Sequence, residues 1–264
     1  MENKKRKANS SSSGNNLTGI IDYLDSELKT TQIKDYSCNG LQVQGSNSVK
    51  KAALVVDACM EAYKIAVKKE CQLIVAHHGI IWNGLKSITG SVYGHIRYLI
   101  QNNLNLYASH LPLDLHPQLG NNARLASIIG LKKLEPFGLY NGINIGFEGV
   151  LPRETKLDLI VQLLCRKLGG ECTVLPFGKD KVKRIAIVSG GGGGELDEAI
   201  EKGIDCFITG ETSHQNYHSA LEAEINVIYA GHYYTEKPGV QAIGNILEEK
   251  FNIETEFIDV PTNF

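Results

Sequence analysis

The stretch KKAALVVDACMEAYKIAVKKECQLIVAHHG, residues 50–79, decides the fold. It contains two short apolar runs, AALVVD at Ala52–Asp57 and QLIVA at Gln72–Ala76, with a helical stretch between them. Short apolar runs suit buried strands, and strands that alternate with helices are typical of βαβ units with a mainly parallel sheet. The sequence therefore predicts an α/β fold.

The same alternation continues along the chain. Apolar residues recur at helical spacing in three further segments, at Ile20–Leu28, Val92–Gln101 and Lys156–Leu168. The last of these segments is followed by Gly169-Gly170, which is a signal for the end of a helix. Further strands are predicted at Asn105–Ala108, Arg184–Val188, Asp205–Thr209 and Asn226–Ala230.

The chain also resembles itself. The strands and helix of residues 50–79 are matched by residues 182–214, and LYASHLPLD (106–114) is matched by IYAGHYYTE (228–236). We interpret this as a duplicated α/β unit that forms two related lobes with mainly parallel sheets, which face a shared metal site. We expect the first lobe to comprise residues 16–135 with 232–264, and the second to comprise residues 136–231.

Composition excludes several classes of protein. The chain has 264 residues, 42% of them hydrophobic, and a formal charge of −2, which gives no general attraction to nucleic acid or anionic membranes. No apolar run approaches the roughly 20 residues that a membrane span needs. The six cysteines include no C-x-x-C pair, which favours a reducing, cytoplasmic location without a sulfur-ligated zinc site.

The N-terminal residues 1–15 are polar and rich in Ser and Asn, and we expect them to be a disordered tail. The basic run Lys4–Lys7 within it has two interpretations. It could direct the protein to the nucleus, whereas a simple solvated tail is the interpretation that the sequence favours.

The histidines and carboxylates that follow strands indicate a metal site. His77 and His78 directly follow a predicted strand, at the edge of the sheet where α/β proteins bind ligands. Because neighbouring residues of an extended chain point to opposite faces, two metal ions could each take one imidazole. The matched segments 106–114 and 228–236 each add a strand, a histidine and, four residues later, a carboxylate that can bridge two ions.

Imidazole and carboxylate ligands without thiolate suit zinc, iron, manganese or nickel. We therefore expect two divalent metal ions per chain. Lone histidines are usually structural, and we assign that role to His95, inside a predicted helix, and to His116, before Pro117.

Five ordered motifs resemble the YbgI-like family, also known as GTP cyclohydrolase 1 type 2 homologues or NIF-three-like dinuclear metal proteins. They are DYSCNGLQVQG (35–45), IVAHHGIIW (74–82), ASHLPLD (108–114), TGETSHQNYHSA (209–220) and AGHYYTEKPGV (230–240). The resemblance covers nearly the whole chain after the tail. It implies two α/β lobes, a toroidal homohexamer built as a trimer of dimers, and two metal ions that line an inner cavity. The chain is too short for the middle domain that some members carry.

The resemblance also implies roles for individual residues. The metal ligands carried over from the family motifs are His77, His78, Asp114, His232 and Glu236. His110 also matches a motif, and the resemblance leaves two roles open for it: a further metal ligand, or a group that orients a ligand or transfers a proton. The two other candidates for proton transfer are Glu211 and His218, for which helix capping and packing are the alternative.

These observations lead to two hypotheses about function. The first is a dinuclear metal-dependent hydrolase that acts on a small molecule, in particular a GTP cyclohydrolase-type enzyme in which metal-activated water opens the imidazole ring of a purine nucleotide. The alternative is a non-enzymatic metal-binding ring or protein-interaction module, since the family's eukaryotic name derives from a partner protein. A ring that encircles nucleic acid is disfavoured by the acidic balance of the chain.

Two glycine-containing segments allow more than one interpretation. The run SGGGGGE, residues 189–195, follows a predicted strand, and its backbone amides could hold a phosphate. It matches neither G-x-G-x-x-G nor a Walker loop, so a turn that permits close backbone approach is the favoured interpretation. Asn39-Gly40 predicts a turn, and the family resemblance places that turn beside the metal cavity.

Overall fold

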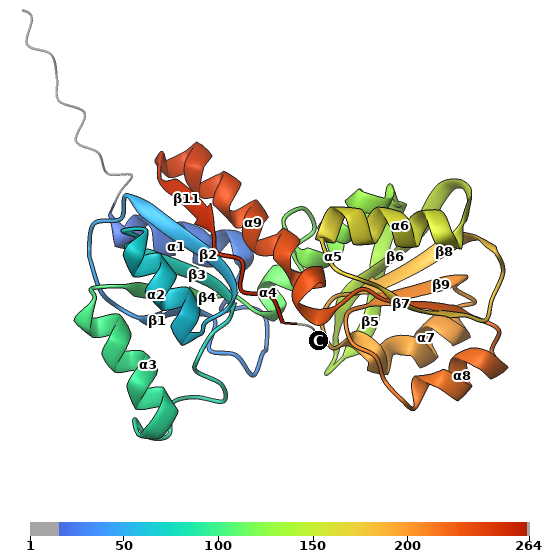
Figure 1. Ribbon diagram of the computed structural model, residues 1–264, viewed down its shortest axis with the longest axis horizontal. Coiled ribbons are helices and arrows are strands. Elements are labelled where there is room, and N and C mark those ends of the chain that lie inside the picture. Colours follow the sequence, from blue (N-terminus) through green and yellow to red (C-terminus); the bar gives the residue numbers. More distant parts are fainter. Residues whose placement is uncertain (1–15, 263–264) are drawn as a thin grey trace, which may run out of the picture.

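The computed structural model describes residues 16–262, which form two α/β lobes side by side (Figure 1). The predicted tail at residues 1–15, including Lys4–Lys7, lies outside the described residues. Within residues 16–262, no helix combines the length and apolar character needed to cross a bilayer.

The first lobe is built on a five-stranded sheet. Its order is β1 (Gly40–Val43), β4 (Asn105–Ala108), β3 (Leu73–His78), β2 (Lys51–Asp57) and β11 (Glu254–Phe257). Only β1 runs antiparallel to its neighbour. One face is covered by α1 (Leu17–Leu28) and α9 (His232–Phe251), and the other by α2 (Met60–Lys68) and α3 (Gly90–Gln101).

The second lobe is built on a six-stranded sheet. Its order is β5 (Lys132–Tyr140), β6 (Ile143–Lys156), β8 (Lys181–Val188), β9 (Cys206–Thr209), β10 (Asn226–Tyr229) and β7 (Thr173–Pro176). One face is covered by α5 (Asn121–Ile129) and α6 (Leu157–Leu168). The other is covered by the 3-10 helix η2 (Gly192–Glu195) with α7 (Leu196–Glu201) and α8 (Asn216–Glu222).

The order of elements confirms that the two lobes are related. In the first lobe the order is α1-β1-β2-α2-β3-α3-β4, and in the second it is α6-β7-β8-α7-β9-α8-β10. In each sheet the last three strands of the series are parallel and adjacent, and the first strand pairs antiparallel with the last. The short helix α4 (Leu111–Asp114) follows β4, as α9 follows β10.

The long hairpin β5–β6 was not predicted from the sequence. It adds two antiparallel strands to the edge of the second sheet, so that this sheet is parallel only at its centre. The reason for the omission is visible in β5, where the first five residues, KKLEP, are all exposed. A strand at a solvated edge lacks the apolar run that marks a buried strand.

Hydrophobic alternation explains why β2 is an interior strand of the first lobe. Leu54 and Val56 pack against α1 and α9 on one face, while Ala53 and Val55 pack against α2 and α3 on the other. Because successive side chains of a strand point to opposite faces, a continuous apolar run serves both layers. This burial fixes the carboxyl ends of β2, β3 and β4 at one edge of the sheet.

Candidate metal centre

The junction between the lobes brings three chain segments together at the carboxyl ends of strands. His77 and His78 are the last two residues of β3, and Asp114 is the last residue of α4, directly after β4. Helix α9 starts beside β10 of the second sheet and then packs on the first sheet, so that its residues His232 and Glu236 lie between the lobes (Figure 1). Together with His110, these residues form a candidate metal site, which we call the metal centre.

Glu236 lies in the middle of this group. Its Oε1 is 3.4 Å from Nε2 of His77 and 3.1 Å from Nε2 of His232, while its Oε2 is 3.4 Å from Nε2 of His78. The i,i+4 spacing of His232 and Glu236 puts both on one face of α9. A carboxylate that presents its two oxygens to different imidazoles has the arrangement of a bridge between two cations.

Asp114 contributes a second carboxylate, of which one oxygen is held by hydrogen bonds. Oδ1 accepts from Nδ2 of Asn121 at 2.8 Å and from Oγ of Ser189 at 3.0 Å. The other oxygen, Oδ2, lies 3.5 Å from Nε2 of His77. The hydrogen bonds to Oδ1 therefore orient the carboxylate, and its other oxygen, Oδ2, faces the centre.

Three imidazoles are oriented in the same way, through their Nδ1 atoms. His77 donates to the backbone carbonyl of Ser109 at 2.9 Å, and the Nδ1 atoms of His78 and His232 lie 2.9 Å from Asp57 and 2.6 Å from Glu211. Each Nε2 is thus left facing Glu236. Such oriented imidazoles are typical of metal ligands, whose other ring nitrogen bonds to a carboxylate or carbonyl.

The donor atoms fit a cation better than they fit one another. Within residues 16–262, Nε2 of His77, Nε2 of His232 and Oε2 of Glu236 are buried and lack a hydrogen-bond partner. Buried polar atoms are normally paired, and atoms without a partner call for an explanation. A pair of divalent cations would satisfy all three atoms.

His110 belongs to the same group. Its ring centroid lies 5.2 Å from that of His77 and 5.5 Å from that of His78, and potential ligand atoms of these three residues lie within 4.8 Å of one another. A second such group contains His78, His232 and Glu236. Asp35, 3.1 Å from Nδ1, orients His110 and leaves its Nε2 available.

Electrostatics in the metal-free protein follow from these contacts. Burial disfavours the charged form of His77, but the Asp114 and Glu236 carboxylates outweigh it and raise the pKa of His77 to about 10. Burial is likewise outweighed at His232, whose pKa is raised to about 9 by Glu236 and Glu211. Burial alone would raise the pKa of Glu236, yet His77 and His78 hold it well below its usual range. Protons thus occupy the centre where cations would bind.

The glycine run approaches the centre closely. Gly190 has a φ of +63°, and a Cβ at this position would meet Oε1 of Glu236 and, at 3.2 Å, Nε2 of His232. The carbonyl of Gly190 accepts hydrogen bonds from the backbone amides of Gly210 and Glu211. The structure therefore shows the close backbone approach favoured by the sequence.

The remaining predicted residues lie at different places. Glu211 contacts His232 directly, whereas His218 lies on the exposed face of α8, where its ring packs on Tyr217. Among the described residues, no hydrogen bond or ligand group joins His218 to the metal centre. Nδ1 of His95 lies 3.2 Å from the hydroxyl of Tyr63, and Nδ1 of His116 accepts a hydrogen bond from the backbone amide of Leu119.

Sequence reasoning missed the residues that orient the imidazoles and carboxylates of this candidate site. Asp35 precedes its partner His110 by 75 positions and lies in a loop, so no sequence pattern connects them. Asp57 could have been found, because it ends β2 at the same sheet edge as His78. The predicted turn at Asn39 does border the centre, since its Oδ1 accepts from the backbone amide of His110 at 2.8 Å.

Comparison with known proteins adds independent information. The GTP cyclohydrolase 1 type 2 homolog of Archaeoglobus fulgidus is 45% identical over 248 residues, which cover 94% of this chain and 99% of that protein. The protein of the same description from Pyrococcus abyssi is 42% identical, and the match covers 92% of this chain and 97% of that protein.

Two solved structures share the fold. The protein ybgI, described as of unknown function, has a TM-score of 0.87 at 33% identity and covers 94% of this chain and 100% of its own. A protein of Thermus thermophilus has a TM-score of 0.87 at 35% identity, with the same coverage. A family model described as Duf34/NIF3 (NGG1p interacting factor 3) matches residues 15–263, which include every residue of the metal centre. The chain therefore belongs to the Duf34/NIF3 family.

Proposed function

We propose that this protein is a dinuclear metal-dependent hydrolase whose ions are held by His77, His78, Asp114, His232 and Glu236. The observation that carries the proposal is the position of Glu236, whose two carboxylate oxygens face imidazoles of different segments. Two divalent ions held there would lower the pKa of a bound water and stabilise the negative charge that develops during its attack. The donor set fits zinc, iron, manganese or nickel.

The protein's own residues would handle protons and orientation. Asp35 holds Nδ1 of His110, so that its Nε2 can exchange a proton with a substrate atom. His110 also lines a cavity of about 270 Å³ with Asp114, His232 and Glu236, which gives a small molecule access to the centre. Glu211 would act through His232, which it orients, rather than on the substrate.

The substrate that we propose is a purine nucleotide, with a GTP cyclohydrolase-type opening of its imidazole ring. Support comes from the description of the relatives as GTP cyclohydrolase 1 type 2 homologs. We also propose that the protein is cytoplasmic and forms a homohexamer, arranged as a trimer of dimers around an inner cavity.

The test combines metal content with product formation. Protein purified without added metal is expected to contain about two ions per chain and to release formate from GTP. His77→Ala and Glu236→Ala should lose both, whereas Glu222→Gln, an exposed carboxyl change on α8, should lose neither. Fully metallated protein that leaves GTP untouched would exclude this substrate.

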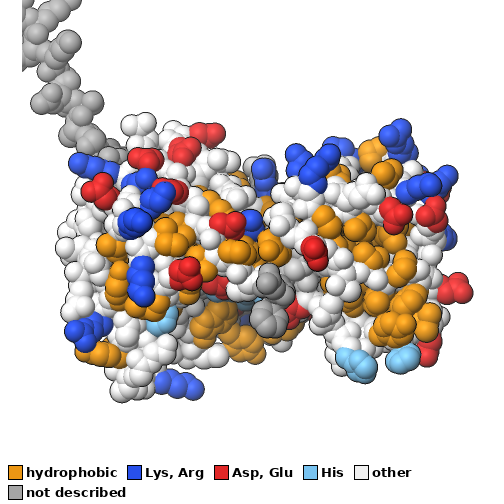
Figure 2. Space-filling view, viewed as in Figure 1, with side chains coloured by type: hydrophobic (Ala, Val, Ile, Leu, Met, Phe, Trp, Pro, Cys, Tyr) orange, Lys and Arg blue, Asp and Glu red, His pale blue; other side chains and the backbone are white. Residues whose placement is uncertain are grey.

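A protein-interaction module is the second candidate, and one surface feature favours it. The stretch that follows His78 exposes large apolar side chains, namely Trp82, Leu85, Ile88 and Tyr93, each 38–49% exposed. Trp82 also packs against His110, at 5.0 Å between ring centroids, so this apolar stretch is continuous with the metal centre. Figure 2 shows how apolar side chains are spread over one face of the molecule. Two results together would favour a protein-interaction module: partner binding that persists in His77→Ala, and no hydrolysis of any phosphoester or nucleotide substrate in an activity screen.

A further inference from the structure

Two free cysteines face each other in the second lobe. Sγ of Cys165 lies 3.0 Å from Sγ of Cys172, and no other two cysteines of residues 16–262 make such a contact. An S–S bond is about 2.05 Å long, so an approach of about 1 Å separates the two thiols from a disulfide. The function proposed for the metal centre uses neither thiol, and the pair therefore needs an explanation of its own.

The connection between α6 and β7 brings the two cysteines together. Cys165 lies in the last turn of α6, which ends at Leu168, and Cys172 directly precedes β7. Gly169 ends the helix with a φ of +84°, a left-handed conformation that glycine adopts without strain, and its amide donates to the carbonyl of Cys165 at 2.9 Å. The chain thus reverses within residues 169–171, and Cys172 returns beside Cys165.

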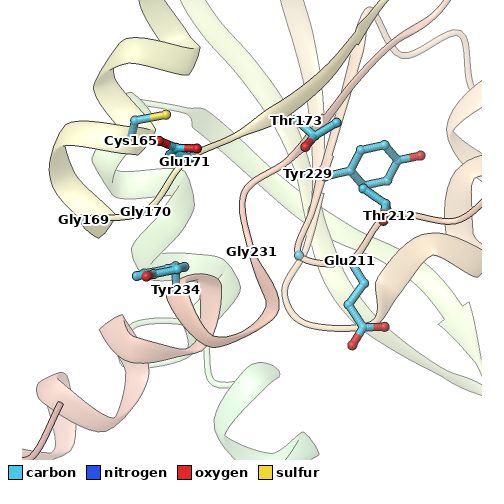
Figure 3. A pocket seen from close by; sticks show the side chains of 11 residues that line it. Cys165, Gly169, Gly170, Glu171, Thr173, Glu211, Thr212, Tyr229, Gly231 and Tyr234 are labelled. Atoms are coloured by element: carbon cyan, nitrogen blue, oxygen red, sulfur yellow. The ribbon is translucent and has the colours of Figure 1, made fainter. Parts of the chain in front are cut away.

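Cys165 is the member of the pair that a small reagent can reach. It lines a cavity of about 980 Å³ beside α6, and Figure 3 shows its sulfur on the α6 side of that space. Cys172 is not part of this lining, and burial together with the hydrogen bond to Cys165 raises the pKa of its thiol above the usual range. Because the thiolate is the nucleophile, a reagent in the cavity reacts first with Cys165.

The connection between the cysteines packs on the first turns of α9. Gly170 lies against the ring of Tyr234, where a Cβ atom would come within 2.5 Å, and Nζ of Lys237 donates to the backbone carbonyl of Leu168 at 3.4 Å. Tyr234 and Lys237 lie on either side, in the sequence, of the proposed metal ligand Glu236. A disulfide would therefore restrain the connection that contacts this part of α9.

We propose that Cys165 and Cys172 form a reversible thiol–disulfide site that reacts with low-molecular-weight disulfides such as oxidised glutathione. The thiolate of Cys165 attacks one sulfur of the reagent and forms a mixed disulfide, and the first thiol leaves with the proton that Cys165 gave up. The sulfur of Cys172 then attacks Sγ of Cys165, and the second thiol leaves with the proton of Cys172. The two cysteine sulfurs together lose two electrons, which reduce the reagent to two thiols.

A compartment that keeps thiols reduced is compatible with such a site. Disulfides in these compartments are usually transient and belong to redox-sensing or catalytic cysteines. The dithiol is then the resting form, and a rise in the ratio of disulfide to thiol forms the bond and restrains the connection against α9. This proposal does not rest on the proposed hydrolase function.

The test treats the reduced full chain with oxidised glutathione and maps its cysteines by mass spectrometry. We expect a disulfide between Cys165 and Cys172 that dithiothreitol reverses. Tm should rise by about 5 °C on oxidation, because the bond restrains the unfolded chain. Cys172→Ser should stop at a mixed disulfide on Cys165, and Cys165→Ser should leave Cys172 unreacted. The matched control is Cys59→Ser at another half-buried cysteine, where serine keeps the N-cap of α2, and it should behave as the wild type.

The proposal fails if Cys165 and Cys172 both remain thiols in a large excess of oxidised glutathione, or if each carries a glutathione of its own. It also fails if Cys165 stays free in Cys172→Ser while other cysteines react. A disulfide between the two residues that leaves Tm unchanged would overturn the proposed restraint of the connection.

Discussion

The imidazole of His77 donates its Nδ1 hydrogen to the backbone carbonyl of Ser109 across 2.9 Å. Because a carbonyl oxygen can only accept, this bond fixes which nitrogen of the neutral ring carries the hydrogen. When the ring is neutral, the lone pair of Nε2 is therefore available to a cation held between this imidazole and the carboxylates of Asp114 and Glu236. The orientation of this fully buried imidazole is therefore set by the main chain rather than by a replaceable side chain.

A pair of substitutions tests this relationship. His77→Ala removes one of the proposed metal ligands, and we expect metal affinity to fall roughly a hundredfold or more. Ser109→Ala keeps the backbone carbonyl and removes a hydroxyl that has no hydrogen-bond partner in the described structure, so metal affinity should stay near that of the wild type. Competition with a coloured chelator measures both. Equal losses in the two variants would contradict the assignment.

The carboxylates that orient His78 and His232 give a second prediction. Asp57→Asn and Glu211→Gln keep the size of each side chain but remove the charge that holds Nδ1. We expect metal affinity to fall roughly 10–100-fold in each variant, with the overall fold retained. Titration calorimetry with Zn²⁺ measures the effect, and Glu222→Gln serves as the matched control. Wild-type affinity in both variants would show that these contacts do not support a metal site.

Gly190 gives a steric prediction. A Cβ at this position would collide with Oε1 of Glu236, and the positive φ adds backbone strain. Gly190→Ala should therefore lower both metal affinity and Tm. Gly194→Ala lies in the same run, where an added Cβ meets nothing within 4 Å, and it should behave as the wild type. Normal metal binding by Gly190→Ala would mean that the backbone can move away without disturbing Glu236.

The sequence predicted the parts of this molecule that depend on local patterns. Asn105–Ala108 was predicted as a strand, and β4 has the same bounds because its apolar run is buried on both faces. The histidine pair and the matched histidine–carboxylate segments were likewise visible, since each lies within a few residues of a strand end. The expected duplication then indicated that they converge.

Other residues take part in the site only because distant chain segments fold together, and local sequence patterns do not predict them. Asp35 reaches His110 from a loop, while Asn121 at the start of α5 and Ser189 after the end of β8 hold Asp114, so these contacts depend on how distant segments meet at the sheet edge. The cavity of about 980 Å³ beside α6 (Figure 3) was equally hidden, since it lies where residues 169–172 connect α6 to β7 by a short segment, and no motif marks it. The lobe boundaries at residues 136 and 232, the homohexamer and the cytoplasmic location stay predictions.

The pH dependence of stability gives the last prediction. In the metal-free protein the pKa values of His77 and His232 are raised to about 10 and about 9, above the value near 6.5 expected in the unfolded chain. Their contribution to the free energy of unfolding is therefore complete below pH 6.5 and is lost as the pH rises through 9 and 10. Glu236, whose pKa is lowered, contributes above about pH 4.5 and loses that contribution as the pH falls.

Tm of the metal-free protein should accordingly decrease between pH 7 and pH 10. Metal-loaded protein should not show this decrease, because the ions replace the protons among the same carboxylates. Calorimetric titration with metal at pH 7, in two buffers of different ionisation enthalpy, should show proton release, and this release should vanish above pH 10. A metal-free Tm that stays constant from pH 7 to pH 10 would mean that His77 is neutral in the folded protein, and the proposed competition between protons and metal would then fail.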